Sequence, residues 1–201
     1  MKALIIYAHP RKESFSHALL KQVQHTLCEK GLEVEVRDLY QLNFQPVLAA
    51  EDTIHVEEGK FVRNQEIFPP DVLVEQEKIL ESDLLIYVFP IWWNGMPAIL
   101  KGYIDRVFQH GFAYSFESDE PKKRFAGKKA IFLTPTGQPQ AMDGEDTELT
   151  KAIKLLTSEW IFNGVDVEIL GHLFFGRVPY LSNDERKGYL EDTASWLNKN
   201  I

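Results

Sequence analysis

Five short runs of apolar residues punctuate the chain and alternate with stretches of helical periodicity, a pattern typical of a parallel α/β sheet. The runs occupy residues 3–8, 33–38, 84–89, 130–134 and 165–170. The first, third and fourth are almost entirely apolar, whereas the second and fifth alternate apolar with charged residues. Because central strands of a parallel sheet are buried on both faces, the two alternating runs belong at its edges. The pattern therefore predicts an α/β fold with a doubly wound five-stranded parallel sheet of order 2-1-3-4-5 and helices on both faces.

Four stretches repeat apolar residues every three or four positions, which is typical of a helix with one face in the core. Their stripes are Leu20, Val23 and Leu27; Leu100, Ile104, Val107 and Phe108; Leu149, Ile153, Leu156 and Trp160; and Leu190, Ala194 and Leu197. Gly31 is expected to terminate the first helix, and Pro97 to occupy the first helical position of the second. Ser182 and Glu185 have the spacing of a capping box for the last helix. We expect all four stripes to pack in the core.

Composition narrows the class of protein. The chain has 201 residues, of which 44% are hydrophobic and 26% charged, and its net charge is −8. We expect residues 1–201 to form one soluble domain, because no linker or repeat divides them. The acidic balance argues against nucleic acid as a partner. The stretch that fits no simple unit, residues 43–71, is long enough to be functional or to cover a partner.

Several classes of site are not predicted. One cysteine, Cys28, excludes an internal disulfide or a cysteine-based metal cluster, and the six histidines lack metal-ligand spacing, so no metal is expected. The longest apolar stretch, residues 84–93, is broken by Pro90 and is shorter than the ~20 residues of a membrane helix. Without a signal-peptide pattern or a membrane contact, a cytoplasmic location is expected. Dinucleotide-fingerprint, P-loop, nucleophile-elbow and HExxH motifs do not occur.

Ligands of such a sheet bind beyond the carboxyl ends of its strands, where the strand order reverses. Here that place lies between the first and third strands, where the loops of residues 9–16, 90–96 and 135–145 meet. The first loop offers His9, Ser14 and Ser16 beside the free N–H groups of a helix start, a combination suited to phosphate. A helix N-cap alone would explain Ser14, but not His9 and a second serine.

The other two loops suit a planar ring. In PIWWNGMP, adjacent Trp92 and Trp93 point to opposite sides of an extended chain, so one can pack inward while the other faces the cleft. Alternatively, both plug the core. In TPTGQPQ, Gly137 lets backbone N–H groups approach the pyrimidine edge of a flavin and stabilise the negative charge of its reduced form. The alternative for this loop is a plain surface turn.

Five segments together resemble the NAD(P)H:quinone oxidoreductases (DT-diaphorase-like) of the flavodoxin-like superfamily. They are AHP-x(3)-SFSHAL, DLY-x-LNFQPV, PIWWNGMPAILKGYIDRVF, GFAYSF and GKKAIFLTPTG, in the family's order and over nearly the whole chain. The third is the most specific. The resemblance implies a flavodoxin-like fold, a homodimer, and a flavin held at the dimer interface, usually FAD and less often FMN. It also implies two-electron reduction of quinones or similar electrophiles by NADH or NADPH.

The resemblance assigns roles residue by residue. The flavin phosphates fall to His9, Ser14, Phe15 and Ser16; the isoalloxazine to Pro90, Ile91, Trp92, Trp93 and Asn94; the pyrimidine edge to Pro135, Thr136, Gly137 and Gln138; and the adenine end to Arg186. Tyr114 and Phe116 match aromatic residues on the substrate side, contributed across the dimer. Trp93 and Tyr114 would sandwich the substrate, and Gly137 N–H groups would stabilise charge, which makes these three the expected catalytic residues.

The chain departs from the better-known animal enzymes of this family in two places. Asp143 aligns where they carry a tyrosine, and the histidine that follows there has no counterpart in a shorter loop. Gly137 is therefore expected to act without a tyrosine–histidine relay. The segment of residues 43–71 is also shorter, which bears on the adenylate tail of the cofactor.

The leading hypothesis is a ping-pong reductase in which NAD(P)H and a small-molecule quinone use one slot in turn. One alternative is an electron-carrier or regulatory flavoprotein, such as an ancillary subunit of a transporter. Another is a binding module of the same fold that holds no flavin.

Overall fold

The computed structural model describes residues 1–63, 68–142 and 145–201, and its centre is a five-stranded parallel sheet. The strands, in spatial order, are β2 (Glu33–Asp38), β1 (Lys2–Tyr7), β5 (Leu84–Val88), β6 (Lys129–Pro135) and β9 (Glu168–Phe175). Each neighbouring pair is parallel. This order confirms the doubly wound topology predicted from the apolar runs, with the alternating strands β2 and β9 at the edges.

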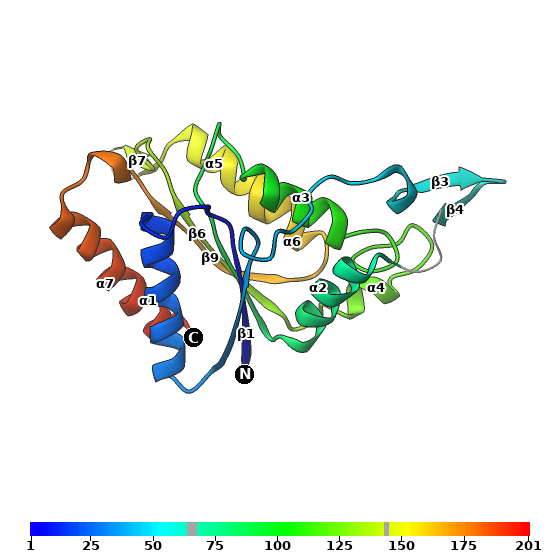
Figure 1. The fold of residues 1–201 in the computed structure, drawn as a ribbon, viewed down its shortest axis with the longest axis horizontal. Helices are drawn as coiled ribbons and strands as arrows, with labels where there is room; N and C mark the ends of the chain where they lie inside the picture. Colours follow the sequence, from blue (N-terminus) through cyan, green and yellow to red (C-terminus); the bar gives the residue numbers. More distant parts are fainter. Residues whose placement is uncertain (64–67, 143–144) are drawn as a thin grey trace.

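Helices cover both faces of this sheet (Figure 1). One face carries α1 (Phe15–Glu29) and α7 (Asn183–Asn200), and the other carries α2 (Pro70–Glu81), α3 (Ala98–Val107), α5 (Glu148–Lys154) and α6 (Trp160–Asn163). Short elements complete the fold: α4 (Glu120–Lys123), the 3₁₀ turns η1 (Ala50–Asp52) and η3 (Val178–Tyr180), and strands β7 (Ala141–Met142) and β8 (Glu145–Asp146). No helix among the described residues is long and apolar enough to cross a membrane.

The core is split into two layers by the sheet. Side chains of β1 alternate between them, so that Ile5 packs under α1 and α7 while Ile6 packs under α2 and α3. In the second layer, Tyr87 of β5 stacks on Phe132 of β6 with ring centroids 5.1 Å apart, and Phe162 of α6 packs edge-on against both. These layers hold the carboxyl ends of β1, β5 and β6 in fixed register.

The predicted helix ends are largely confirmed. Ser14 caps α1 by accepting a hydrogen bond from the His17 N–H, and Gly31, with a φ of 77°, follows its last residues. Ser182 and Glu185 form the expected capping box at α7. Pro97 stands at the N-cap of α3 rather than at its first helical position, one residue earlier than predicted.

The fifth strand begins later than predicted. Val165 and Val167 are buried, but their N–H groups donate to the Phe162 carbonyl at 3.2 and 3.0 Å, and Asp166 has a left-handed φ of 64°. These residues therefore close helix α6 instead of entering the sheet. Strand β9 runs from Glu168 to Phe175, five residues beyond the predicted end at Leu170.

The third helical stripe is wrong as a core prediction. Ile153 is buried, whereas Leu149, Leu156 and Trp160 are exposed, Trp160 by 69%. For Leu156 and Trp160 the reason is a π-helical turn, η2 (Leu155–Glu159), which inserts an extra residue between α5 and α6. That residue rotates the next helical turn, so Phe162 enters the core in place of Trp160.

Residues 43–63 form an arm beside the main sheet. Strands β3 (Ile54–Glu57) and β4 (Lys60–Arg63) pair as a separate antiparallel hairpin that projects beyond the helices (Figure 1). The segment leading to it lies against α3, where the buried Arg106 donates to the Gln45 carbonyl at 2.8 Å.

Candidate active site

A cleft of about 380 Å³ opens at the carboxyl ends of β1, β5 and β6. The loops predicted to meet there do meet. Eleven of the expected cofactor residues line it: His9, Ser14, Phe15, Ser16, Pro90, Ile91, Trp92, Pro135, Thr136, Gly137 and Arg186. Trp93, Asn94 and Gln138 are not among the residues lining this cleft.

The first wall is the start of α1. N–H groups in the first turn of a helix have no intrahelical acceptor, and the helix dipole adds positive potential there. Ser14 Oγ accepts from the His17 N–H at 3.1 Å and so caps the helix. Ser16 is almost fully buried at the base of the loop. Arg11 adds a cationic side chain to the same wall.

His9 is held neutral beside this loop. Its Nδ1 accepts a hydrogen bond from the Arg11 N–H at 3.0 Å, and its ring lies 5.6 Å from the Trp92 ring. Partial burial lowers the pKa of His9, because a charged imidazole would be poorly solvated there. With Nδ1 accepting, the ring proton sits on Nε2, where it can donate to a ligand.

The second wall is a tight turn at the end of β5. Trp92 and Gly95 exchange two backbone hydrogen bonds of 3.1 Å, and Trp93 and Asn94 between them have φ values of 48° and 62°. This left-handed pair directs the Trp93 side chain into solvent, fully exposed, while Trp92 stays 40% exposed at the cleft. The expectation that one tryptophan packs inward is wrong, and so is the alternative that both plug the core.

The third wall is pinned by the backbone. The Ile91 N–H donates to the Pro135 carbonyl at 2.8 Å, and the Thr136 N–H donates to the Phe175 carbonyl at 2.9 Å. The Gln138 N–H donates to Thr136 Oγ1 at 3.2 Å. Gly137 stands exposed between these fixed points, so its backbone can be approached closely by a ligand.

The cleft continues past Phe15 onto α7. An adjoining groove of about 450 Å³ shares Glu13, Ser14, Phe15 and Arg186 with it. Arg186 donates from Nη2 to Asn183 Oδ1 at 2.9 Å, which holds its guanidinium between the two spaces. The groove continues the cleft along the first turns of α1 and α7.

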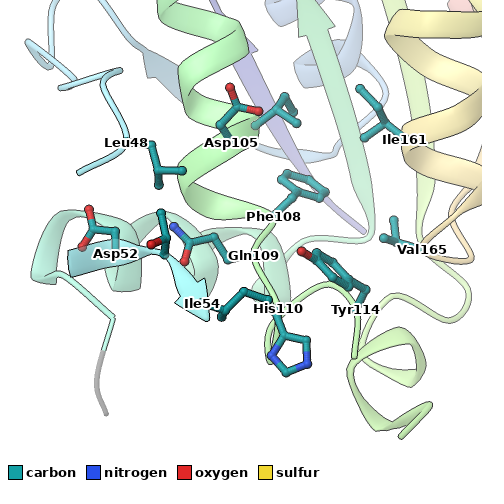
Figure 2. Close-up of a pocket in the computed structure, with 12 residues that line it drawn as sticks. Leu48, Asp52, Ile54, Asp105, Phe108, Gln109, His110, Tyr114, Ile161 and Val165 are labelled. Carbon is teal, nitrogen blue, oxygen red and sulfur yellow. The ribbon is translucent and has the colours of Figure 1, made fainter. Parts of the chain in front are cut away.

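The two predicted substrate residues lie elsewhere. Figure 2 shows Tyr114 pointing into a second cavity, of about 450 Å³, between the end of α3, the root of the arm and α6. Phe116 is 61% exposed outside it. A single chain thus does not bring Tyr114 or Phe116 to Trp92 and Gly137, and their predicted role depends on a second chain.

Comparisons with known proteins agree with this geometry. The profile of a family with a flavodoxin-like fold matches residues 1–197. A protein of Haemophilus influenzae named uncharacterized NAD(P)H oxidoreductase is 33% identical over 195 residues, covering 96% of this chain and 93% of that protein. The chain belongs to this flavodoxin-like family.

Two further members carry more specific names. NAD(P)H dehydrogenase (quinone) 1 of Cavia porcellus is 38% identical over 151 residues, which are 70% of this chain and 55% of that protein. The solved NAD(P)H:quinone oxidoreductase of Methanothermobacter marburgensis has a TM-score of 0.79 and 28% identity, covering 97% of this chain and 93% of that one. The family predicted from the motifs is therefore confirmed.

Sequence reasoning missed four residues that line the family's cleft: Arg11, Glu13, Val178 and Pro179. Arg11 and Glu13 stood inside the first loop and could have been named from its charge. Val178 and Pro179 follow β9, and the early predicted end of that strand concealed them. Asp143, aligned with a family tyrosine, lies outside the described residues.

Proposed function

We propose that this chain is a flavin-dependent NAD(P)H:quinone oxidoreductase. Its overall reaction converts NAD(P)H, a proton and a quinone into NAD(P)⁺ and a hydroquinone, with donor and acceptor using one slot in turn. The observation that carries the proposal is the single cleft that joins a helix N-terminus, Trp92 and Gly137. The sequence similarity to proteins named as NAD(P)H and quinone oxidoreductases supports the same activity.

The residues present fit a flavin. An anionic phosphate suits the start of α1, where Ser14, Ser16 and the Nε2–H of His9 can all donate. A flat ring suits the space between Trp92 and the Pro135–Gly137 backbone. A flavin bound there would supply the hydride-transfer chemistry that the amino-acid side chains lack.

The protein's own part in the reaction is positioning and electrostatics. Trp93, with Tyr114 of a second chain, would hold the substrate ring within hydride reach. The Gly137 N–H would face the pyrimidine edge and stabilise negative charge there. Asn94 and Gln138 would complete the ring site through their backbone. We propose no acid–base side chain, because the cleft-lining histidine, His9, is committed to the phosphate side.

FAD is the proposed cofactor. An FMN would end at the phosphate loop, whereas the groove beyond Phe15 and Arg186 has room for a second nucleotide unit. Releasing the flavin from purified protein and weighing it by mass spectrometry distinguishes the two. FMN alone would contradict this part of the proposal.

A homodimer is proposed for the same site, because Tyr114 and Phe116 can only reach Trp93 from a second chain. A single domain over residues 1–201 and a cytoplasmic location complete the proposal, the latter because NAD(P)H is the electron donor.

The deciding experiment is anaerobic mixing of the purified yellow protein with NADPH, followed by a quinone. We expect the flavin absorbance to bleach within seconds to minutes and to return when quinone is added. A flavin that stays oxidised with both NADPH and NADH would contradict the function. Slow quinone turnover with a stable one-electron reduced form would favour an electron carrier instead.

A further inference from the structure

The β3–β4 hairpin at the end of the arm contacts the body through Arg63. An isolated two-stranded hairpin is marginally stable in water, so contacts with the body must hold it. Arg63 of β4 donates to Gln109 Oε1 at 2.6 Å and to the His110 carbonyl at 3.0 Å. Both partners belong to the turn that follows α3. The arm is therefore anchored on the segment that leads directly to Tyr114 and Phe116.

Phe61 makes the second contact between the arm and this turn. Its ring centroid lies 4.4 Å from that of Phe116 and 5.9 Å from that of His110. Phe116 in turn lies 5.6 Å from His110 and 5.4 Å from Tyr114. Of these three rings, Phe61 lies nearest to Phe116. Because Phe116 is otherwise 61% exposed, the Phe61 ring limits where the Phe116 ring can go.

The root of the arm also shares a cavity with Tyr114. Figure 2 shows Ile54 of β3 on one wall and Tyr114 on another, with His110 between them. A displacement of the arm would therefore change the space around both predicted substrate residues, Tyr114 through the cavity and Phe116 through Phe61.

We propose that Phe61 determines acceptor specificity by fixing the position of Phe116, so that the arm sets the size of quinone accepted. The inference rests on the proposed function, in which Phe116 faces the acceptor across a dimer. Without the Phe61 ring, Phe116 can move aside and the slot widens. The kcat/KM for two-ring quinones then rises relative to that for one-ring quinones, because the smaller ring loses a contact in the wider slot.

The test compares benzoquinone with menadione as acceptors for the flavin-loaded protein. In a ping-pong reaction, kcat/KM for the acceptor does not depend on the donor half-reaction, so the ratio of the two values isolates the acceptor slot. We expect Phe61→Ala to raise the menadione-to-benzoquinone ratio about three- to tenfold, the range expected for one aromatic pair. Phe61→Tyr, which keeps the ring, should retain the wild-type ratio.

A double-mutant cycle decides whether Phe61 acts through Phe116. If it does, Phe116→Ala shifts the ratio in the same direction and the double variant shifts it no further. Val62→Ala, on the opposite face of the same strand, is the matched control and should leave the ratio unchanged. Phe61→Leu repeats the test if Phe61→Ala folds poorly, as judged by flavin content.

Three results would overturn the inference: an unchanged ratio in Phe61→Ala, multiplied effects in the double variant, or an equal shift in Val62→Ala. Failure of the proposed function looks different, because the wild-type protein would then reduce neither quinone.

Discussion

At the scale of single residues, the loop proposed to bind the flavin phosphates contains no glycine, so the phosphate contacts are assigned to its side chains. His9, with its proton on Nε2, and the buried Ser16 both face the cleft. Replacing both with alanine should weaken flavin binding at least about tenfold, since hydrogen bonds to a charged group are worth ~1.5–3 kcal/mol each. Ser14 is left intact because it caps α1.

Flavin dissociation constants measured by fluorescence check this, together with thermal unfolding of the apoprotein. The matched control is His25→Ala with Ser195→Ala, which removes the same side chains from exposed helix positions. Full flavin occupancy of the His9/Ser16 variant after extensive dialysis would show that the loop binds phosphate through its backbone alone.

His172 is a second residue that yields a prediction, because its surroundings make the stability of the protein depend on pH. Its Nε2 lies 3.1 Å from Thr134 Oγ1 and its Nδ1 lies 2.9 Å from Ser158 Oγ. Burial, and then the positive charge of Lys154, lower its pKa from 6.5 to about 3. Ser158 Oγ also donates to the Lys154 carbonyl at 2.8 Å, and Thr134 Oγ1 to the Leu173 carbonyl at 3.3 Å, so both hydroxyls beside the ring are held in place.

This histidine should make stability fall on acidification. An unfolded His172 takes up a proton below its ordinary pKa while the folded one does not, so stability is lost as pH decreases below about 6.5. The slope approaches ~1.4 kcal/mol per pH unit from this one group. Urea unfolding between pH 5 and 7 measures it, and His172→Phe should flatten the dependence by that amount. An equal effect of His25→Gln, an exposed histidine, would contradict the assignment to His172.

Residue type predicted which loops form the cleft but not where each side chain points. His9, Ser16 and Gly137 could be placed because they follow strands whose carboxyl ends must share an edge of the sheet. Trp92 and Trp93 could not be placed, because the answer lies in the positive φ at Trp93 and Asn94. The pair Asn94-Gly95 predicts a turn there, but not which way either tryptophan points.

At the scale of elements, the order of the strands could be predicted from the sequence, but the helix face that packs in the core could not be predicted for every helix. Continuous and alternating apolar runs separate central from edge strands wherever a sheet is buried on both sides. The predicted apolar stripe of α5 and α6 does not enter the core as a whole. Within the π turn, the Thr157 and Ser158 hydroxyls donate to the Ile153 and Lys154 carbonyls, four residues back, at 2.7 and 2.8 Å. Such bonds compete with the helical ladder and accompany the π turn, and periodicity carries no sign of them.

Two helical glycines test the packing of elements with one substitution. A Cβ at Gly102 of α3 would lie 2.1 Å from the Pro46 carbonyl oxygen, whereas a Cβ at Gly188 of α7 meets no atom within 4 Å. Gly102→Ala should therefore destabilise the protein by ~1–3 kcal/mol through overpacking. Gly188→Ala should stabilise it by ~0.5–1 kcal/mol through helix propensity.

Urea unfolding measures whether the free energy of unfolding falls in the Gly102 variant and rises in the Gly188 variant. The Gly102 variant should also loosen the segment before the arm, visible as faster hydrogen exchange in residues 45–49. A Gly102→Ala variant as stable as the wild type would mean that this segment does not rest on α3 in solution.

At the scale of the whole molecule, one group of exposed apolar side chains is a candidate surface for contact with a second copy of the chain. The exposed apolar residues of α5, η2, α6, the arm and the segment after α3 include Leu149, Leu155, Leu156, Trp160, Leu48, Val56, Phe61 and Phe116. Exposed apolar side chains in such numbers mark interaction surfaces. One of them, Leu48, lines the second cavity, together with Tyr114 of the proposed substrate site. The proposed homodimer would use this surface, where the π turn exposes Leu156 and Trp160.

Substitutions at that surface, away from the cleft, should break the proposed dimer. Leu156→Glu with Trp160→Glu places two charges where apolar contact is expected, so light scattering should show a dimer for the wild type and a monomer for this variant. Quinone turnover should fall at least about tenfold, because the monomer lacks the second chain's Tyr114 and Phe116 and loses the oriented substrate. Leu42→Glu, at an exposed leucine beside the end of β2, is the matched control and should stay dimeric and active. A monomeric wild type with full turnover would separate the activity from the dimer and return the acceptor site to a single chain.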